Sequence, residues 1–147
     1  MKIAIVHHAE KKRDSEDPEL TAFGMQQSER AAQFVAKRLT IEKIYYTKTA
    51  RTKESALPFQ HLFPEAESIV IDDAPQEWDS WCQFAETCYK QYPYTSVLLC
   101  HHTTIQMCKK QFQLSLSLSS HSSVIILERT KEYTWNVVDI RQGEISL

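Results

Sequence analysis

The sequence lacks an excess of charge of either sign, and it contains no extended basic stretch. Its 17 lysines and arginines and 19 aspartates and glutamates leave a formal net charge of −2. The densest basic cluster, residues 11–13, is followed at once by Asp14, Glu16 and Asp17. Because nucleic-acid binding requires a basic surface that follows the phosphate backbone, the sequence predicts no nucleic-acid partner.

Long hydrophobic runs are also lacking. The apolar stretch within residues 1–6 is too short for a signal peptide, and no other segment is apolar over the roughly 20 residues that a membrane-spanning helix needs. We therefore expect no membrane segment and a cytoplasmic protein.

The cysteines lack the CxxC spacing that is typical of redox and metal motifs, and they fall within apolar patterns. They stand at positions 82, 88, 100 and 108. In a chain without an export signal, this distribution predicts reduced, buried thiols rather than disulfides.

What is present indicates an ordinary globular protein. A length of 147 residues, with 42% apolar and 24% charged residues, is the usual size and composition of one domain. We therefore expect residues 1–147 to form a single domain. Neither length nor composition determines the oligomeric state.

Strand-like and helix-like segments alternate along most of the chain. Strands are predicted at residues 2–7, 43–47, 68–72 and 96–100, and helices at residues 21–39, 49–63, 75–92 and 104–112. This alternation is typical of a mainly parallel sheet with helices on both faces. The sequence therefore predicts an α/β fold, a three-layer α/β/α sandwich.

The last third of the chain changes character. The apolar run at residues 124–127, the polar turn at 129–132 and the alternating segment at 133–137 predict an antiparallel hairpin at the edge of the sheet. The alternation of serine and leucine at residues 114–119 is compatible with either a further strand or a loop folded over the sheet.

Two of the predicted strands lead into a pair of histidines, His7–His8 and His101–His102. The carboxyl ends of parallel strands line the ligand crevice of an open α/β sheet, so residues just beyond them can meet although they lie far apart in sequence. The sequence therefore predicts that histidines of both pairs converge on one site.

Two further features favour an anionic ligand at that site. Thr103 and Gln106 have the spacing of a capping box, which predicts a helix start with unpaired N–H groups beside the second histidine pair. Arg51 stands near the start of another predicted helix, and its planar guanidinium suits bidentate binding of phosphate oxygens. Together these groups indicate phosphoryl chemistry.

The order of the motifs resembles that of the histidine phosphatase superfamily, also called phosphoglycerate mutase-like. The motifs are Val6-His-His-Ala-Glu10, Leu20-Thr-Ala-Phe-Gly24, Ile44-Tyr-Tyr-Thr-Lys-Thr-Ala-Arg51 with Ser55-Ala56, and Val97-Leu-Leu-Cys-His101. The chain is most similar to short members, such as the bacterial phosphohistidine phosphatases. This resemblance implies a phosphatase without a cofactor that acts on a phosphorylated small molecule or a phosphoprotein.

The resemblance also implies roles for individual residues. His8 would be the nucleophile that is transiently phosphorylated, and Arg51 and His101 would hold and neutralise the transferring group. These roles agree with the chemistry, since a neutral imidazole is a competent nucleophile near pH 7 and needs no metal. Glu77 lies where larger members of the family place the acid that protonates the leaving group; a solvent-facing position in the first turn of a helix is the alternative.

Two positions depart from the family pattern. The arginine that precedes the nucleophile in the family is His7 here, which removes a permanent charge and should weaken phosphate binding. The glycine that follows the second histidine is His102, whose side chain either crowds the pocket or adds a hydrogen-bond donor.

These departures leave three hypotheses open. The first is an active phosphatase, and the second is a family member that binds a phosphorylated or other anionic ligand without turnover. The third is a zinc or other transition-metal site formed by His7, His8 and His101, with His102 or Glu10. The third is disfavoured because Arg51 would lie beside the cation.

Overall fold

The computed structural model describes residues 1–91, 94–115, 121–130 and 134–143, with the backbone alone for residues 88–91. The elements run in the order β1 (Lys2–His7), α1 (Ala22–Ala36), β2 (Lys43–Thr47), α2 (Ala50–Leu62), β3 (Glu67–Ile71), α3 (Trp78–Gln91), β4 (Ser96–Cys100), α4 (His102–Gln111), β5 (Val124–Arg129) and β6 (Trp135–Arg141). The predicted alternation of strand and helix is confirmed.

The strands form one sheet in the order β3-β2-β4-β1-β5-β6. Strands β3, β2, β4 and β1 are parallel to one another, and β5 pairs antiparallel with both β1 and β6. The mainly parallel sheet with an antiparallel hairpin at one edge is therefore confirmed. Because β1 lies directly beside β4, the two histidine pairs leave the sheet from neighbouring strands.

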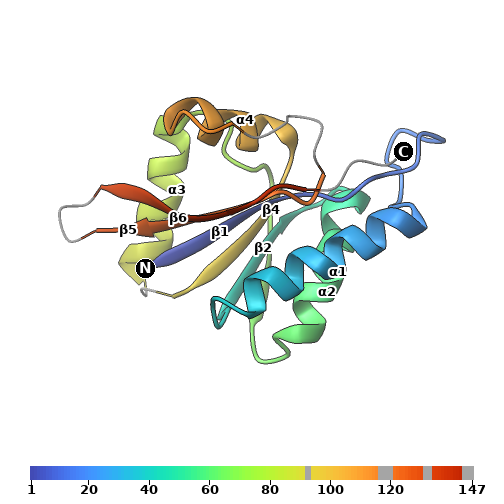
Figure 1. The fold of residues 1–147 in the computed structure, drawn as a ribbon, viewed down its shortest axis with the longest axis horizontal. Helices are drawn as coiled ribbons and strands as arrows, with labels where there is room; N and C mark the ends of the chain where they lie inside the picture. Colours follow the sequence, from blue (N-terminus) through green and yellow to red (C-terminus); the bar gives the residue numbers. More distant parts are fainter. Residues whose placement is uncertain (92–93, 116–120, 131–133, 144–147) are drawn as a thin grey trace.

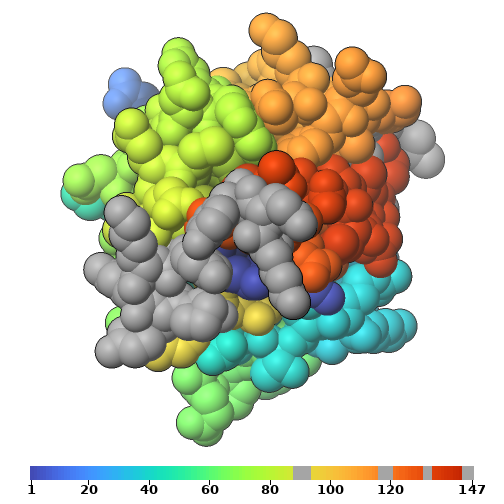
Figure 2. All heavy atoms as spheres, turned by 90° about the vertical axis from the view of Figure 1, so that its left-hand side faces the viewer, coloured from blue at the N-terminus to red at the C-terminus, as the bar shows by residue number. Residues whose placement is uncertain are grey.

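Helices cover both faces of the sheet, as a three-layer sandwich requires (Figure 1). One apolar cluster joins the sheet to α1 and α2 through side chains that include Val35 and Phe59. A second joins the opposite face to α3 and α4 through Trp81 and Ile105, among others. Figure 2 views the end at which the parallel strands begin and shows α3 and α4 above and α1 and α2 below.

The start of α1 packs directly against the segment that follows β1. Thr21 caps the helix, since its Oγ1 accepts a hydrogen bond from the Gly24 N–H at 2.9 Å. A Cβ atom at position 24 would collide with the backbone carbonyl of Glu10. Only glycine allows this approach, which holds the chain in place two residues after His8.

Some boundaries differ from those that the sequence predicts. Helix α3 begins at Trp78 rather than at Pro75: the Trp81 N–H donates to the Glu77 carbonyl at 2.9 Å, whereas the Pro75 carbonyl accepts from the Thr104 hydroxyl of α4 at 2.6 Å. Strand β6 continues to Arg141, which pairs with Val124 at the start of β5. Residues 131 and 132 of the predicted turn at 129–132, and residues 116–119 of the alternating segment at 114–119, lie outside the described residues.

The cysteines agree with the sequence expectation where the structure describes them. Cys100 and Cys108 are buried, Cys82 is partly buried, and these three are free thiols. The side chain of Cys88 lies outside the described part. None of the helices in the described ranges has the length and apolar character that a membrane span requires.

Candidate active site

The segment that carries His7 and His8 is held by hydrogen bonds to both neighbouring strands. The backbone N–H of His8 donates to the Cys100 carbonyl of β4 at 2.9 Å. On the other side, the N–H of His7 donates to the Ser123 carbonyl at 3.0 Å, and the N–H of Ser122 donates to the His7 carbonyl at 3.1 Å. Hydrogen bonds on both sides therefore fix the backbone from which the two imidazoles extend.

His8 has one ring nitrogen engaged and the other available. Its Nδ1 lies 2.8 Å from the carbonyl oxygen of Ala9. A carbonyl only accepts hydrogen bonds, so Nδ1 carries the proton and Nε2 carries the lone pair. The adjacent backbone is fixed in turn, since the Ala9 N–H donates to the Ser55 hydroxyl at 2.9 Å. The geometry presents Nε2 as a nucleophile or a ligand atom.

The protonation state of His8 follows from its surroundings. The residue is only 4% exposed. Burial, followed by the proximity of His7, His121 and His101, holds the pKa of the His8 imidazole well below its ordinary value of 6.5. The imidazole is therefore neutral at pH 7, as nucleophilic attack requires.

Arg51 and His101 form a pair beside His8. The Arg51 Nε–H donates to Nδ1 of His101 at 3.2 Å, and the rings of His101 and His8 lie 5.6 Å apart between centroids. Nε2 of His101 lies 3.3 Å from the Thr47 hydroxyl. Burial and the Arg51 guanidinium lower the pKa of His101. The predicted convergence of His8, Arg51 and His101 is confirmed.

The start of α2 already accommodates a carboxylate oxygen. Thr49 occupies the cap position without making a side-chain cap, and the first N–H of the helix, that of Ala50, donates to the Asp17 carboxylate at 2.9 Å. A carboxylate fits there because the first N–H groups of a helix are unpaired and carry partial positive charge. Arg51 follows immediately, so the same end of the helix offers both an N–H group and a guanidinium.

Sequence reasoning missed His121, which belongs to the same site. Its ring stacks on His7 with 5.0 Å between centroids, and it lies 5.4 Å from the ring of His8. The sequence could have indicated His121, because this residue lies three positions before the predicted strand at 124–127. Because β5 runs antiparallel to β1, the start of β5 lies beside the carboxyl end of β1.

The family model for the histidine phosphatase superfamily (branch 1) matches residues 4–93, which is more than half of the chain. The chain belongs to the histidine phosphatase superfamily. The matched range contains His8 and Arg51, whereas His101 follows it in sequence and joins the site through the pairing of β4 with β1.

Solved structures of phosphatases share the fold at low sequence identity. The protein histidine phosphatase SixA, complexed with tungstate, superposes with a TM-score of 0.79 at 10% identity and covers 97% of each chain. Phosphoserine phosphatase from Entamoeba histolytica, in complex with 3-phosphoglyceric acid, gives 0.70 at 14% identity, covering 97% of this chain and 98% of that one. Mycobacterial glucosyl-3-phosphoglycerate phosphatase with VO3 gives 0.73 at 15%, covering 97% and 99%. No curated protein matches the chain in sequence.

The second histidine pair of this superfamily member divides its two residues between different environments. His101 is the cap of α4 and accepts the Thr104 N–H at 3.1 Å through its carbonyl, so the helix begins at His102. The predicted capping box at Thr103 is therefore wrong: the extended backbone of His101 already ends the strand, and Thr103 lies inside the first turn. His102 is exposed and Thr103 is half-buried.

Glu77 is exposed and lies just before α3. With Asp73 and Phe84 it lines a surface pocket of about 540 Å³. This pocket adjoins the histidine site, because the Asp73 carboxylate acts on His101 and partly opposes the lowering of its pKa by burial and Arg51.

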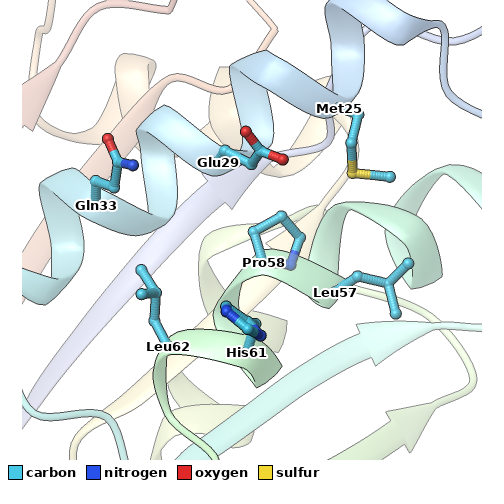
Figure 3. Close-up of a pocket in the computed structure, with 7 residues that line it drawn as sticks. All are labelled: Met25, Glu29, Gln33, Leu57, Pro58, His61 and Leu62. Atoms are coloured by element: carbon cyan, nitrogen blue, oxygen red, sulfur yellow. The ribbon is translucent and has the colours of Figure 1, made fainter.

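Another pocket, of about 410 Å³, lies between α1 and α2 (Figure 3). Its walls include Met25 of α1 and Leu57 and His61 of α2. None of the site histidines lines it. The site histidines lie elsewhere, beyond the carboxyl ends of β1 and β4 and before β5, so His61 is a histidine outside that cluster.

Acid should destabilise this histidine phosphatase fold before its carboxylates titrate. The pKa values of His8, His101 and His121 are all lowered in the folded state, chiefly by burial. Below pH 6.5 the unfolded chain therefore binds more protons than the folded chain, and the free energy of unfolding falls as the pH falls. Each such histidine contributes at most about 1.4 kcal/mol per pH unit.

Urea unfolding between pH 7.5 and about pH 5 measures this slope. The variant His8→Asn is expected to reduce it, because it removes the most deeply buried of the three imidazoles. A wild-type stability that is constant or rises as the pH falls across this range would contradict the assignment of neutral, buried histidines.

Proposed function

We propose that the protein is a phosphatase in which His8 accepts a phosphoryl group from a phosphoester or a phosphohistidine and then transfers it to water. The observation that carries this proposal is the state of His8: a buried, neutral imidazole whose Nδ1–H is held by the Ala9 carbonyl. This state leaves the lone pair of Nε2 beside the pair formed by Arg51 and His101. Membership of the histidine phosphatase superfamily supports the same chemistry.

The first step forms a bond between Nε2 of His8 and phosphorus while the bond from phosphorus to the leaving oxygen or nitrogen breaks. Charge accumulates on the phosphoryl oxygens during this transfer and is best stabilised by donors that are already in place. Arg51 would supply a planar pair of N–H donors, and His101 would supply a further one. Attack by water on the phosphorus then releases phosphate and returns His8 to its neutral form.

Three further residues would complete the phosphate site. His7 and the exposed His102 would donate ring N–H groups to phosphoryl oxygens, and Thr103 lies in the first turn of α4, where N–H groups are unpaired. His7 holds the position at which the family has a permanently charged arginine. Phosphate binding should therefore be weaker than in a site with that arginine.

The leaving group decides whether an acid is needed. An alkoxide requires a proton as it leaves, and Glu77, beside Asp73 in the adjoining pocket, is the residue that we assign to this role. A protonated imidazole leaves more readily, so a phosphohistidine substrate would make Glu77 dispensable. Retention of activity by Glu77→Gln on one substrate class but not the other would distinguish the two.

The substrate class that we propose is a phosphorylated small molecule or a phosphoprotein. The solved relatives support this choice, because one is complexed with tungstate, one with VO3 and one with 3-phosphoglyceric acid. All three ligands are oxyanions or carry a phosphoryl group. The site of this chain offers cationic and N–H donors of the kind that such groups require.

The decisive experiment is to trap the phosphorylated intermediate. The purified chain is mixed with a small phosphodonor such as acetyl phosphate or phosphoramidate, quenched at alkaline pH and analysed by mass spectrometry. We expect one phosphate per chain that is stable in base, labile in acid and located on His8. A phosphate located on another residue, or a wild-type chain that never becomes labelled, would contradict the proposal.

Binding without turnover is a second candidate function, and the specific observation that favours it is His7. Loss of the arginine at this position would lower the rate of phosphoryl transfer while leaving Arg51 and His101 to hold an anion. In that case inorganic phosphate or vanadate would bind to the wild-type chain, and no substrate in a broad panel of phosphoesters and phosphohistidine would be hydrolysed.

A further inference from the structure

His7, His8 and His121 form a cluster that phosphoryl transfer as proposed above does not explain. Each offers one ring nitrogen, and these three atoms lie within 4.8 Å of one another. His7 and His8 are buried, and His121 is partly buried. The rings also contact one another, with centroids 4.6 Å apart for His7 and His8 and 5.0 Å apart for His7 and His121. Three converging imidazole nitrogens are a common ligand set for transition metals.

We propose that His7, His8 and His121 bind a zinc ion. This ligand set differs from the one that the sequence suggests, because His101 is not part of the cluster and donates no ligand atom to it. His101 is instead engaged with Arg51 and Thr47. The Arg51 guanidinium donates to His101, which is not a ligand in this set, so no ligand of the proposed ion is hydrogen-bonded to the cationic side chain.

The hydrogen bonding of His8 matches that of a metal ligand. A histidine that binds a metal through one ring nitrogen usually donates its other ring N–H to a carboxylate or a backbone carbonyl, which fixes the tautomer and the ring orientation. His8 donates Nδ1–H to the Ala9 carbonyl at 2.8 Å and leaves Nε2 to the cluster. Zinc binds the neutral form of imidazole, which is the form that burial favours here.

The scaffold holds two ligands in place and allows the third to adjust. The backbone of His7 and His8 is bonded to Cys100 on one side and to Ser122 and Ser123 on the other. Three nitrogens around a tetrahedral zinc ion lie about 3.4 Å apart. Nitrogens that lie up to 4.8 Å apart must therefore approach one another by up to about 1.4 Å, and His121 can contribute to this movement because it lies outside the strands.

The loop around His121 is nevertheless ordered by packing. Gly143 approaches so closely that a Cβ at that position would collide with the His121 carbonyl, and the Gly143 N–H donates to the Ser123 hydroxyl at 2.9 Å. The charged groups that act on His121 are Glu10, which favours a cation, and Lys11 and Arg13, which oppose one. Lys11 is half-buried and Arg13 is exposed on the loop, where solvent screens its charge.

Zinc at this site would use the nucleophile itself. Nε2 of His8 cannot donate its lone pair to a metal and to phosphorus at the same time. If the proposed phosphatase activity is correct, zinc therefore inhibits it by competing with the substrate, and removal of the metal restores it. This consequence rests on the proposed function, whereas the binding of zinc does not.

Zinc binding is tested directly on the full chain, purified without a histidine tag and freed of metal by a chelator. Competition with a chromogenic zinc chelator is expected to show one tight site per chain. His121→Ala should lower the affinity at least tenfold, and His8→Asn should do the same. His61→Ala, which changes a histidine on the exposed part of α2, should bind zinc as the wild type does. X-ray absorption on the loaded protein should show three nitrogen ligands from imidazole.

Two results would overturn the proposal: wild-type zinc affinity in His121→Ala, or a loss in His61→Ala as large as that in His121→Ala. Circular dichroism of each metal-free variant separates a lost ligand from a lost fold. If His121→Ala is unfolded, His121→Gln provides the same test with a polar side chain of similar length. Because no substrate enters these measurements, a protein that binds zinc but hydrolyses nothing would refute the proposed function alone.

Discussion

Replacing His8 with asparagine is expected to abolish phosphoryl transfer while leaving the fold intact. The asparagine amide can take over the hydrogen bond that Nδ1–H of His8 donates to the Ala9 carbonyl, but it has no counterpart of the Nε2 lone pair. Because the proposed mechanism forms a covalent bond to that nitrogen, we expect turnover to fall by about three orders of magnitude or more. The acid-labile phosphate should also disappear.

The measurement is the rate of phosphate release under single-turnover and steady-state conditions. His61→Asn is the matched control, because it makes the same chemical change at an exposed position on α2, outside the site. Full activity in His61→Asn with none in His8→Asn is the expected result. Substantial turnover by a folded His8→Asn protein would mean that another group, or water directly, attacks the phosphorus.

The second large effect is expected at Arg51. Replacing the guanidinium in Arg51→Gln removes the hydrogen bond to Nδ1 of His101 and, under the proposed mechanism, the donor to the phosphoryl oxygens. Loss of a preorganised donor at a site of developing charge costs roughly two to three orders of magnitude in rate. Arg51→Lys should recover little of this loss, since an ammonium group keeps the charge but not the planar pair of donors.

The contact between Arg51 and His101 can also be tested without an activity assay, by titration of His101. The Arg51 guanidinium is the second cause, after burial, of the lowered pKa of His101, so Arg51→Gln should raise that pKa toward 6.5. NMR of the histidine ring protons measures the change. Lys53→Gln removes one positive charge from an exposed position of α2 and is the control. Equal losses of activity in the two variants, together with an unchanged pKa of His101, would mean that Arg51 acts only through its positive charge.

Much of the site follows from sequence because it depends on one topological rule. Parallel strands present their carboxyl ends at one edge of a sheet, so histidines that follow β1 and β4 must emerge on the same side. Arg51 follows β2 by the same rule, and β2 is the other neighbour of β4. These residues converge although His8 and His101 are far apart in the chain.

Local sequence patterns predict the starts of the helices around the site less accurately. The T-x-x-Q spacing at Thr103 suggested a cap, but the backbone of His101 takes that position because β4 ends one residue earlier, at Cys100. The apolar periodicity of α3 predicts a start at Pro75, whereas the Pro75 carbonyl accepts from the Thr104 hydroxyl and the helix begins at Trp78. Helix and strand termini depend on which backbone groups find partners, and periodicity does not record these partners.

The sequence by itself determined the α/β architecture, the superfamily and the meeting of His8, Arg51 and His101. Only the tertiary structure decided that His121 joins them, that Arg51 engages His101 rather than His8, and that Nε2 is the available nitrogen of His8. The physical reason is the difference between local and long-range interactions. Periodicity and strand ends are properties of neighbouring residues, whereas the stacking of His121 on His7 depends on the antiparallel pairing of β5 with β1, which joins segments more than a hundred residues apart.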